Sequence, residues 1–184
     1  MLAKQMVAKP WLAQAFQRDR NSPTKLIAEL AGVRSRGFVT ADELTQIARI
    51  KVAGSGGVNR IEALIRGNTE EAIYVASASA FQQDNPALAV ENLLTLRGIR
   101  VPLASAVLAW CLPSKWAVID VHTWSTLREF DGWPEVPTVF TRDHFERYMQ
   151  RVDELSTATG WEPQKVDRWL FAFSKCGFRI SDFD

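Results

Sequence analysis

Apolar residues recur along this chain mainly at the three- and four-residue spacing of amphipathic helices, and alternating apolar and polar segments are nearly absent. One clear example begins at Thr40, because Thr40 and Glu43 have the spacing of a capping box. Apolar Leu44, Ile47 and Val52 follow on one face of the same helix. The pattern therefore predicts an all-α fold of roughly nine or ten short helices.

Prolines, glycines and capping residues divide the chain into these helices. The segment from Leu103 to Leu112 is apolar on nearly all sides, so we expect it to be the central buried helix. Residues 54–57, Gly-Ser-Gly-Gly, indicate a flexible connector. The other expected helices lie between Pro23 and Gly32, from Thr40 to Val52, from Asn59 to Gly67, from Thr69 onward, from Pro86 to Gly98, from Asp120 to Phe130, from Thr141 to Thr159 and from Pro163 to Gly177.

The composition is typical of a globular protein, with 184 residues of which 47% are hydrophobic and 23% charged. A chain of this size can bury its own core, and we expect a single unit over residues 1–184. Its longest apolar runs are far shorter than the ~20 residues that cross a bilayer, so no membrane association is expected. The first residues lack the apolar core of a signal peptide, which makes the cytoplasm the expected compartment.

Cysteine and charge content restrict the chemistry further. Only Cys111 and Cys176 are present, which excludes a disulfide framework, a four-cysteine zinc site and an iron–sulfur cluster, and no metal site is predicted. Both cysteines lie in apolar, helix-like surroundings and are expected to be buried. The formal net charge is +1, so any nucleic-acid binding would need a local basic patch.

Residues 96–104, Leu-Arg-Gly-Ile-Arg-Val-Pro-Leu-Ala, indicate a tight hairpin between two helices. One helix would end at Gly98 and the next would begin at Pro102. The N-terminus of the second helix and the amides of the turn suit a phosphate oxygen, and Arg97 and Arg100 add charge at the same edge. The apolar residues that would hold the turn against both helices are Leu96, Ile99 and Val101.

A single carboxylate, Asp120, lies in the nearly apolar run from Ala117 to Trp124. An unpaired buried carboxylate costs several kcal/mol or more, so the fold must pair this group or use it. An aspartate at a helix start is a favourable N-cap that accepts backbone N–H groups two and three residues on. The two roles are compatible, because a capping carboxylate has a second oxygen that can face a substrate.

Together, these two motifs resemble those of the helix-hairpin-helix (HhH-GPD) superfamily of DNA glycosylases. The family hairpin typically has the form L-P-G-V-G-x-K-x-A, followed by an aspartate in V-D-x-H. The I-D-V-H-T-W block is most similar to the 8-oxoguanine DNA glycosylase branch, where V-D-V-H-x-W is usual. The positions that carry the resemblance are Gly98, Ala104, Asp120 and His122.

The resemblance implies a two-lobed helical bundle with a cleft between the lobes. The lobes would comprise residues 20–95 and residues 1–19 together with 96–184. A monomer would bind duplex DNA there with one damaged or modified base rotated out of the stack. Asp120 would stabilise the oxocarbenium ion that forms as the N-glycosidic bond breaks, and it would activate the attacking water.

Two departures from the family pattern change this expectation. Pro102 takes the place of the lysine that forms a Schiff base in bifunctional members, so the resemblance implies a monofunctional enzyme that releases only the base. Arg100 replaces the second hairpin glycine, so a positive φ there would cost about 1 kcal/mol or the turn must bend differently. The resemblance also allows a monovalent cation at the hairpin, with no other cofactor.

Residues near these motifs complete the expected site. By resemblance, the DNA contacts would come from Arg97, Gly98, Ile99, Arg100, Val101 and, beside the flipped nucleotide, His122. Trp110, Trp116 and Trp124 are near enough in sequence to line a base pocket. Lys51 is a second candidate nucleophile, because a lysine beside a glycine-rich turn can closely approach a phosphate or a bound base. Each has a plainer interpretation, because tryptophans on apolar helices usually pack in a core and a lysine at a helix C-terminus is usually solvated. The second histidine, His144, is expected to be solvated.

Two alternatives to an enzyme remain open from the sequence. The altered hairpin and the near-zero net charge also fit a catalytically inactive DNA-binding module of the same fold. An all-α protein-interaction domain explains the helices but leaves the hairpin and Asp120 coincidental.

Overall fold

The computed structural model describes residues 1–15, 23–53 and 57–178, and every regular element in these ranges is an α-helix. The all-α fold predicted from the sequence is thereby confirmed. Most of the connector expected at residues 54–57 lies outside the described residues. In chain order the helices are α1 (Leu2–Ala8), α2 (Leu12–Ala15), α3 (Thr24–Glu29), α4 (Ala31–Arg36), α5 (Ala41–Lys51), α6 (Val58–Arg66), α7 (Glu70–Gln82), α8 (Pro86–Leu94), α9 (Val101–Cys111), α10 (Val121–Asp131), α11 (Arg142–Thr159) and α12 (Pro163–Lys175).

The helix ends follow the capping signals in the sequence. At the start of α5 the Glu43 amide donates to the Thr40 side chain, and the Thr40 amide donates to the Glu43 carboxylate over 2.8 Å. The start of α11 repeats this box, with the imidazole of His144 accepting from the Thr141 amide over 3.0 Å. His144 is therefore not simply solvated as expected, because its ring completes a helix cap and is half-buried.

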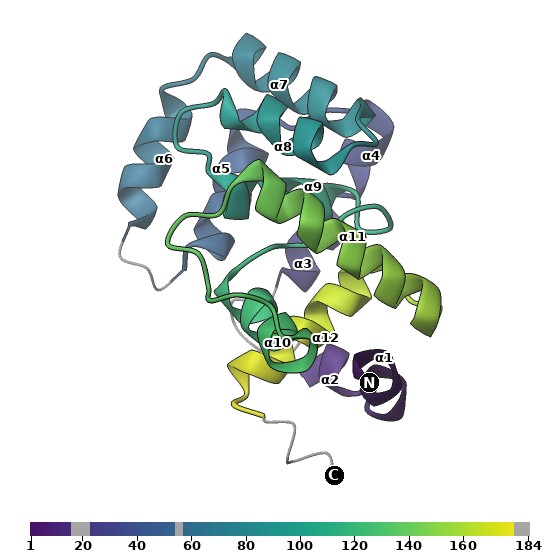
Figure 1. Cartoon of the computed structure of the whole chain (residues 1–184). Helices are drawn as coiled ribbons and strands as arrows, with labels where there is room; N and C mark the ends of the chain where they lie inside the picture. Colours follow the sequence, from purple (N-terminus) through teal and green to yellow (C-terminus); the bar gives the residue numbers. More distant parts are fainter. Residues whose placement is uncertain (16–22, 54–56, 179–184) are drawn as a thin grey trace.

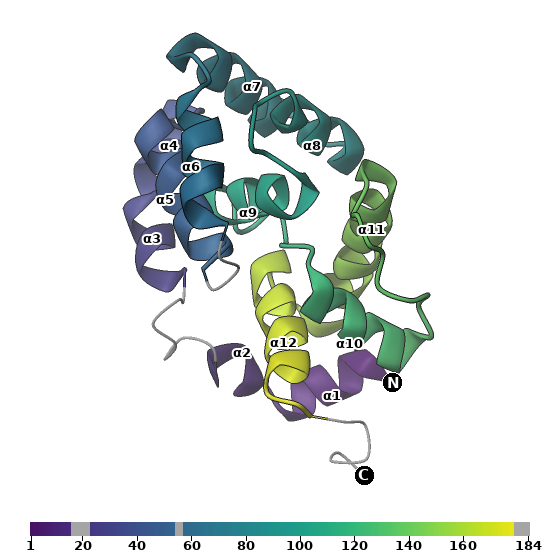
Figure 2. The same ribbon diagram turned by 90° about the vertical axis from the view of Figure 1, so that its left-hand side faces the viewer.

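The helices form two groups that share one hydrophobic core (Figures 1 and 2). Helices α3 to α9 make up the first group, and α1, α2, α10 and α12 make up the second. Helix α11 joins them, because it packs against α8 and α9 on one side and against α1 and α12 on the other. Helix α9, expected with the C-terminal residues, packs mainly against α5 and α8 of the first group.

Helix α9 is the central buried helix that its apolar sequence predicted. Every residue from Leu103 to Cys111 is buried. The one polar side chain in this stretch, Ser105, donates to the Pro102 carbonyl and accepts from the Ile119 amide. Since Ile119 directly precedes Asp120, this buried hydroxyl fixes the segment that leads into α10 against the centre of the fold.

The two cysteines differ in environment. Cys111 is buried as expected, and burial raises the pKa of its thiol to about 12, which leaves it unreactive at neutral pH. Cys176 is exposed, contrary to expectation, because it is the C-cap residue of α12 and lies beyond the last buried turn. Across the described ranges, none of the helices has both the length and the apolar composition that a membrane crossing needs.

Candidate functional site

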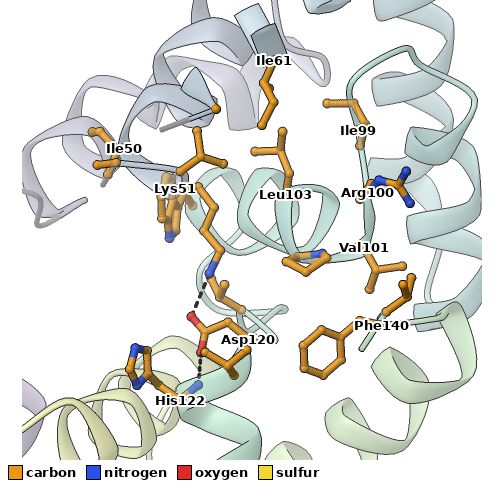
Figure 3. Close-up of a pocket in the computed structure, with 18 of the residues that line it drawn as sticks. Ile50, Lys51, Ile61, Ile99, Arg100, Val101, Leu103, Asp120, His122 and Phe140 are labelled. Atoms are coloured by element: carbon orange, nitrogen blue, oxygen red, sulfur yellow. Dashed lines mark hydrogen bonds and ion pairs between the residues drawn. The ribbon is translucent and has the colours of Figure 1, made fainter. Parts of the chain in front are cut away.

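A cavity of about 1530 Å³ lies between the two groups of helices. One wall is formed by the end of α5, by α6 and by the turn between α8 and α9. The opposite wall is formed by the start of α10 and by α12, and a third side is closed by residues 137–141 of the loop before α11 and by Arg142 at the start of α11. Figure 3 shows that Lys51 and Asp120 extend toward each other from opposite walls.

The turn between α8 and α9 fits closely against α6. Gly98 adopts a φ of +83°, which favours glycine, and an added Cβ would lie 3.0 Å from the Leu64 Cβ and 3.2 Å from the Ile61 carbonyl oxygen. Asn68, just after α6, accepts from the Arg97 amide over 2.9 Å and donates to the Arg97 carbonyl over 3.1 Å. The hairpin predicted from the sequence is thus anchored to α6 and to Asn68, which lies 29 positions before Arg97 in the chain.

The two arginines of the turn do not share one edge. Arg100 lines the cavity, whereas Arg97 does not, and a guanidinium nitrogen of Arg97 lies beside Gly67 at the end of α6. Arg100 is the N-cap residue of α9 with a φ of −125°, which is extended backbone that any residue adopts. Arg100 therefore does not carry the conformational cost of about 1 kcal/mol that was expected for a residue in place of the second hairpin glycine. Among the described residues of the turn, only Gly98 has a positive φ.

Asp120 uses its two carboxylate oxygens for different purposes. Oδ1 accepts from the amides of His122 and Thr123 over 2.9 and 3.0 Å, as expected of an N-cap. Oδ2 accepts from Nζ of Lys51 over 2.8 Å. The Lys51 and Asp120 side chains are only 13% and 14% exposed, and both line the cavity. The carboxylate is thus a cap and a cavity group at once.

The ion pair decides the charge state of the carboxylate. Burial by itself would raise the pKa of Asp120, but the charge and hydrogen bond of Lys51, together with the Thr123 amide, outweigh burial and hold the pKa below its ordinary value. His122 also lines the cavity, and its Nδ1 lies 3.2 Å from the Ser174 hydroxyl. Burial lowers the pKa of His122 against the opposing charge of Asp120, which favours a neutral imidazole at pH 7.

The cavity lining is basic although the whole chain is nearly neutral. It includes two carboxylates, those of Asp120 and Asp167. Lys51 is paired with Asp120, and Arg142 is paired with Glu91 over 2.7 Å. The other basic side chains of the lining, which form no ion pair with any residue in the described ranges, are Arg60, Arg100, Arg168 and Lys175. These four cations form the local basic patch that nucleic-acid binding would require.

The structure brings most of the expected site residues to one cavity but moves two of them into the core. Gly98, Ile99, Arg100, Val101, Asp120, His122 and Lys51 all line it. Trp116 and Trp124 do not, because both are buried in the packing around α11. Trp116 packs beside Phe145, and Trp124 packs against Trp133 and donates its indole N–H to the Pro134 carbonyl. Of the three tryptophans considered, Trp110 is the one that lines the cavity.

Helix α12 contributes cavity residues that the sequence did not reveal. Asp167, Arg168 and Phe171 lie more than 40 residues after Asp120 in the chain and reach the cavity only because α12 packs against α10. Asp167 nevertheless had a signal of the same kind as Asp120. It is a lone carboxylate on the apolar side of a helix, flanked by buried Val166 and Trp169.

The donor groups at the site give little support for a metal. In the part of the chain that the structure describes, no group of three or more histidine, cysteine or acidic side chains is arranged to hold an ion. A monovalent cation at the hairpin would need backbone carbonyls, but those of Leu96, Arg97 and Arg100 accept hydrogen bonds from Ile99, Asn68 and the first turn of α9. The cation therefore stays a prediction from the resemblance, and no step below depends on it.

Comparison with known proteins does not add to this picture. No protein-family model matches the chain, and neither does any curated protein or solved structure. Its function is therefore inferred from the cavity and the residues that line it.

Proposed function

We propose that this protein is a DNA glycosylase of the helix-hairpin-helix type that hydrolyses the N-glycosidic bond of a damaged or modified base. The observation that carries the proposal is the ionised Asp120, held by Lys51 at a cavity with a basic lining and with the hairpin at its rim. The two groups of helices would be the two lobes of that fold, with DNA bound between them. This assignment explains why the hairpin motif and the Asp120 motif both contribute residues to one cavity.

Each part of the proposed reaction has a group positioned for it. Arg100 and the backbone amide of Val101 would hold a phosphate at the cavity rim. The cavity of about 1530 Å³ has room for an extruded nucleotide. When the C1′–N bond breaks, its electron pair leaves with the base and positive charge develops on the sugar. The Asp120 carboxylate would stabilise that charge and accept the proton of the attacking water.

A survey of substrates tests this proposal directly. The protein is incubated with duplex oligonucleotides that each carry one lesion, including oxidised, deaminated and alkylated bases, and then treated with hot alkali. We expect strand breaks at the lesion for at least one class, since alkali cleaves the abasic site that base release leaves. Tight binding with no release for any lesion would support the inactive DNA-binding module, and no binding at low salt would favour a protein partner.

The position of Lys51 favours a second candidate, in which the enzyme also cleaves the strand. The sequence indicated a monofunctional enzyme, because Pro102 replaces the family's lysine. The structure, however, brings a different amine, Nζ of Lys51, to within 2.8 Å of Asp120. After losing a proton, this amine would attack C1′ in place of water and displace the base with the electron pair of the C1′–N bond. Opening of the sugar ring, in which the C1′–O4′ bond breaks and O4′ takes up a proton, would then give a Schiff base. Elimination of the 3′ phosphate would then break the strand.

Borohydride reduction distinguishes the two candidates. It converts a Schiff base into a stable amine, so wild-type protein should form a covalent complex with a duplex that contains an abasic site if Lys51 is the nucleophile. Lys51→Arg should abolish the complex, whereas Lys115→Arg should form it normally. Lys115 is a matched control because it pairs with Asp84 over 2.7 Å but does not line the cavity. Absence of a complex in the wild type, with base release intact, would leave water as the nucleophile.

The basic lining makes a separate prediction about salt dependence. Arg100→Gln should weaken DNA binding and reduce the slope of log affinity against log salt by about one, because one phosphate contact is lost. Arg97→Gln removes the same charge from the same turn, but its guanidinium lies beside Gly67, outside the cavity. Fluorescence anisotropy over a salt series measures both slopes. Equal reductions in the two variants would show that the cavity edge is not the phosphate contact.

A further inference from the structure

Asp167 is the second carboxylate of the cavity and has no part in the reaction proposed above. It lies on α12 and is 7% exposed. Its Oδ1 accepts from the buried Tyr148 hydroxyl over 3.3 Å, and this is the one hydrogen bond that its side chain makes with residues in the described ranges. Its second oxygen, Oδ2, is left for a group in the cavity.

The surroundings of Asp167 favour its neutral form. Burial, and next the negative charge of Asp120, raise the pKa of Asp167 to about 8. The groups that oppose this shift are Lys51 on α5, the Tyr148 hydroxyl on α11 and Arg168 on α12 itself. Lys51 is already paired with Asp120 and therefore compensates Asp167 only in part. At neutral pH the cavity thus has one ionised and one protonated carboxyl group.

The hydrogen bond from Tyr148 decides where the proton of Asp167 lies. Because Oδ1 accepts from the Tyr148 hydroxyl, it acts as the carbonyl oxygen of the neutral acid, and Oδ2 carries the proton. The group therefore offers the cavity a hydrogen-bond donor. Gln164 lies one turn earlier on the same helix and also lines the cavity, and its Nε2 is enclosed without a hydrogen-bond partner in the described ranges. Two polar side chains of one helix face are thus left for a ligand to complete.

We propose that Asp167 is the specificity residue of the site and that its neutral carboxyl donates a hydrogen bond to a carbonyl oxygen of the extruded base. The inference rests on the proposed glycosylase function and names its substrate class as keto bases. An amino group at the same position of the base is itself a donor and would oppose the Asp167 O–H. When Asp167 is ionised it can only accept, so the preference should reverse or disappear.

Binding measurements test this inference independently of catalysis. The duplexes carry one 2′-fluoro nucleotide, which slows cleavage because fluorine destabilises the oxocarbenium ion. The base of this nucleotide is varied in two pairs: hypoxanthine against adenine, and uracil against cytosine. Each pair exchanges a keto group for an amino group with little change of shape. At pH 6.5 we expect wild-type protein to bind the keto member about tenfold more tightly, which corresponds to one net hydrogen bond. At pH 8.5, which lies above the pKa of about 8 of Asp167 but below the pH at which the keto bases lose their own ring proton, this ratio should fall toward one.

Two variants separate recognition from stability. Asp167→Asn has the shape of the neutral acid and a donor that does not titrate, so its keto preference should persist at both pH values. Asp167→Leu should lose the preference at both. A keto preference that is unchanged by pH and by Asp167→Leu, or equal binding of both bases by the wild type, would overturn the inference. If the rate of base release is the same in wild type and in both Asp167 variants, the role of Asp167 in base recognition is overturned but the proposed enzyme activity is not. If the keto preference in binding is present but no base is released, only the proposed enzyme activity is overturned.

Discussion

Asp120→Asn should lower the rate of base release by about 10²- to 10⁴-fold while the protein remains folded. Asparagine caps a helix about as well as aspartate, so its Oδ1 can still accept from the amides of His122 and Thr123. What the substitution removes is the negative charge that would face the sugar. The rate of strand breakage after alkali, measured under single-turnover conditions, reports the loss. DNA affinity should stay the same or rise, since a negative charge near the phosphates is gone.

A second aspartate provides the control for this variant. Asp84 is paired with Lys115 over 2.7 Å, as Asp120 is with Lys51, but it lies outside the cavity, so Asp84→Asn should leave the rate unchanged. The pH dependence gives a further check. Because the pKa of Asp120 lies below its ordinary value of 3.8, loss of this charge should not slow the wild-type enzyme until the pH falls below about 4. A normal rate in Asp120→Asn would show that the carboxylate is only a helix cap.

The fold was largely predictable because its signals are local. Capping residues such as Thr40 and Thr141 act within one helical turn, so their pattern in the sequence locates helix starts accurately. The central position of α9 was likewise predictable from its continuous apolar composition. Cys176 shows the limit of this reasoning, since apolar neighbours in sequence did not ensure burial one residue beyond the end of α12.

The candidate site was predictable only in part, because its residues come from helices that are far apart in the sequence. The hairpin and Asp120 are 20 residues apart and were recognised together. The partner of Asp120 could not be found in this way, since Lys51 comes from α5 and 69 residues separate the pair. Trp116 and Trp124 were misplaced for the opposite reason. They are close to Asp120 in sequence, but the segment before α10 and the buried face of α10 place them in the core around α11.

The charged groups of the cavity determine one another's protonation states. A buried Lys51 would be costly without Asp120, and without Lys51 the main opposition to the effect of burial on the pKa of Asp120 would be lost. Because Lys51 is paired with Asp120, it and Arg168 together do not outweigh the effect of burial on the pKa of Asp167. The pairing of Lys51 with one of the two aspartates thus favours two different protonation states in one cavity, which is the condition for giving the two carboxyl groups different roles.

Gly98→Ala should destabilise the protein by about 2–4 kcal/mol, through two effects that add. The first is the positive φ of +83°, which costs an alanine about 1–2 kcal/mol. The second is contact, because the new Cβ would lie 3.0 Å from the Leu64 Cβ and 3.2 Å from the Ile61 carbonyl oxygen, and backbone atoms of α6 cannot easily move away. The midpoint of urea unfolding, at a constant slope, measures the change in the free energy of unfolding.

Gly132→Ala separates the two effects and connects the turn to function. Gly132 has a similar φ of +67° but nothing within 4 Å of the position its Cβ would take, so this variant should lose only the contribution of the positive φ, about 1–2 kcal/mol. The excess loss in Gly98→Ala then measures how tightly the turn is held against α6. If that fit positions Arg100 at the cavity rim, Gly98→Ala should also weaken DNA binding under conditions where it remains folded, whereas Gly132→Ala should not. Equal stability losses and equal DNA affinities in the two variants would show that the close approach to α6 has no role in the site.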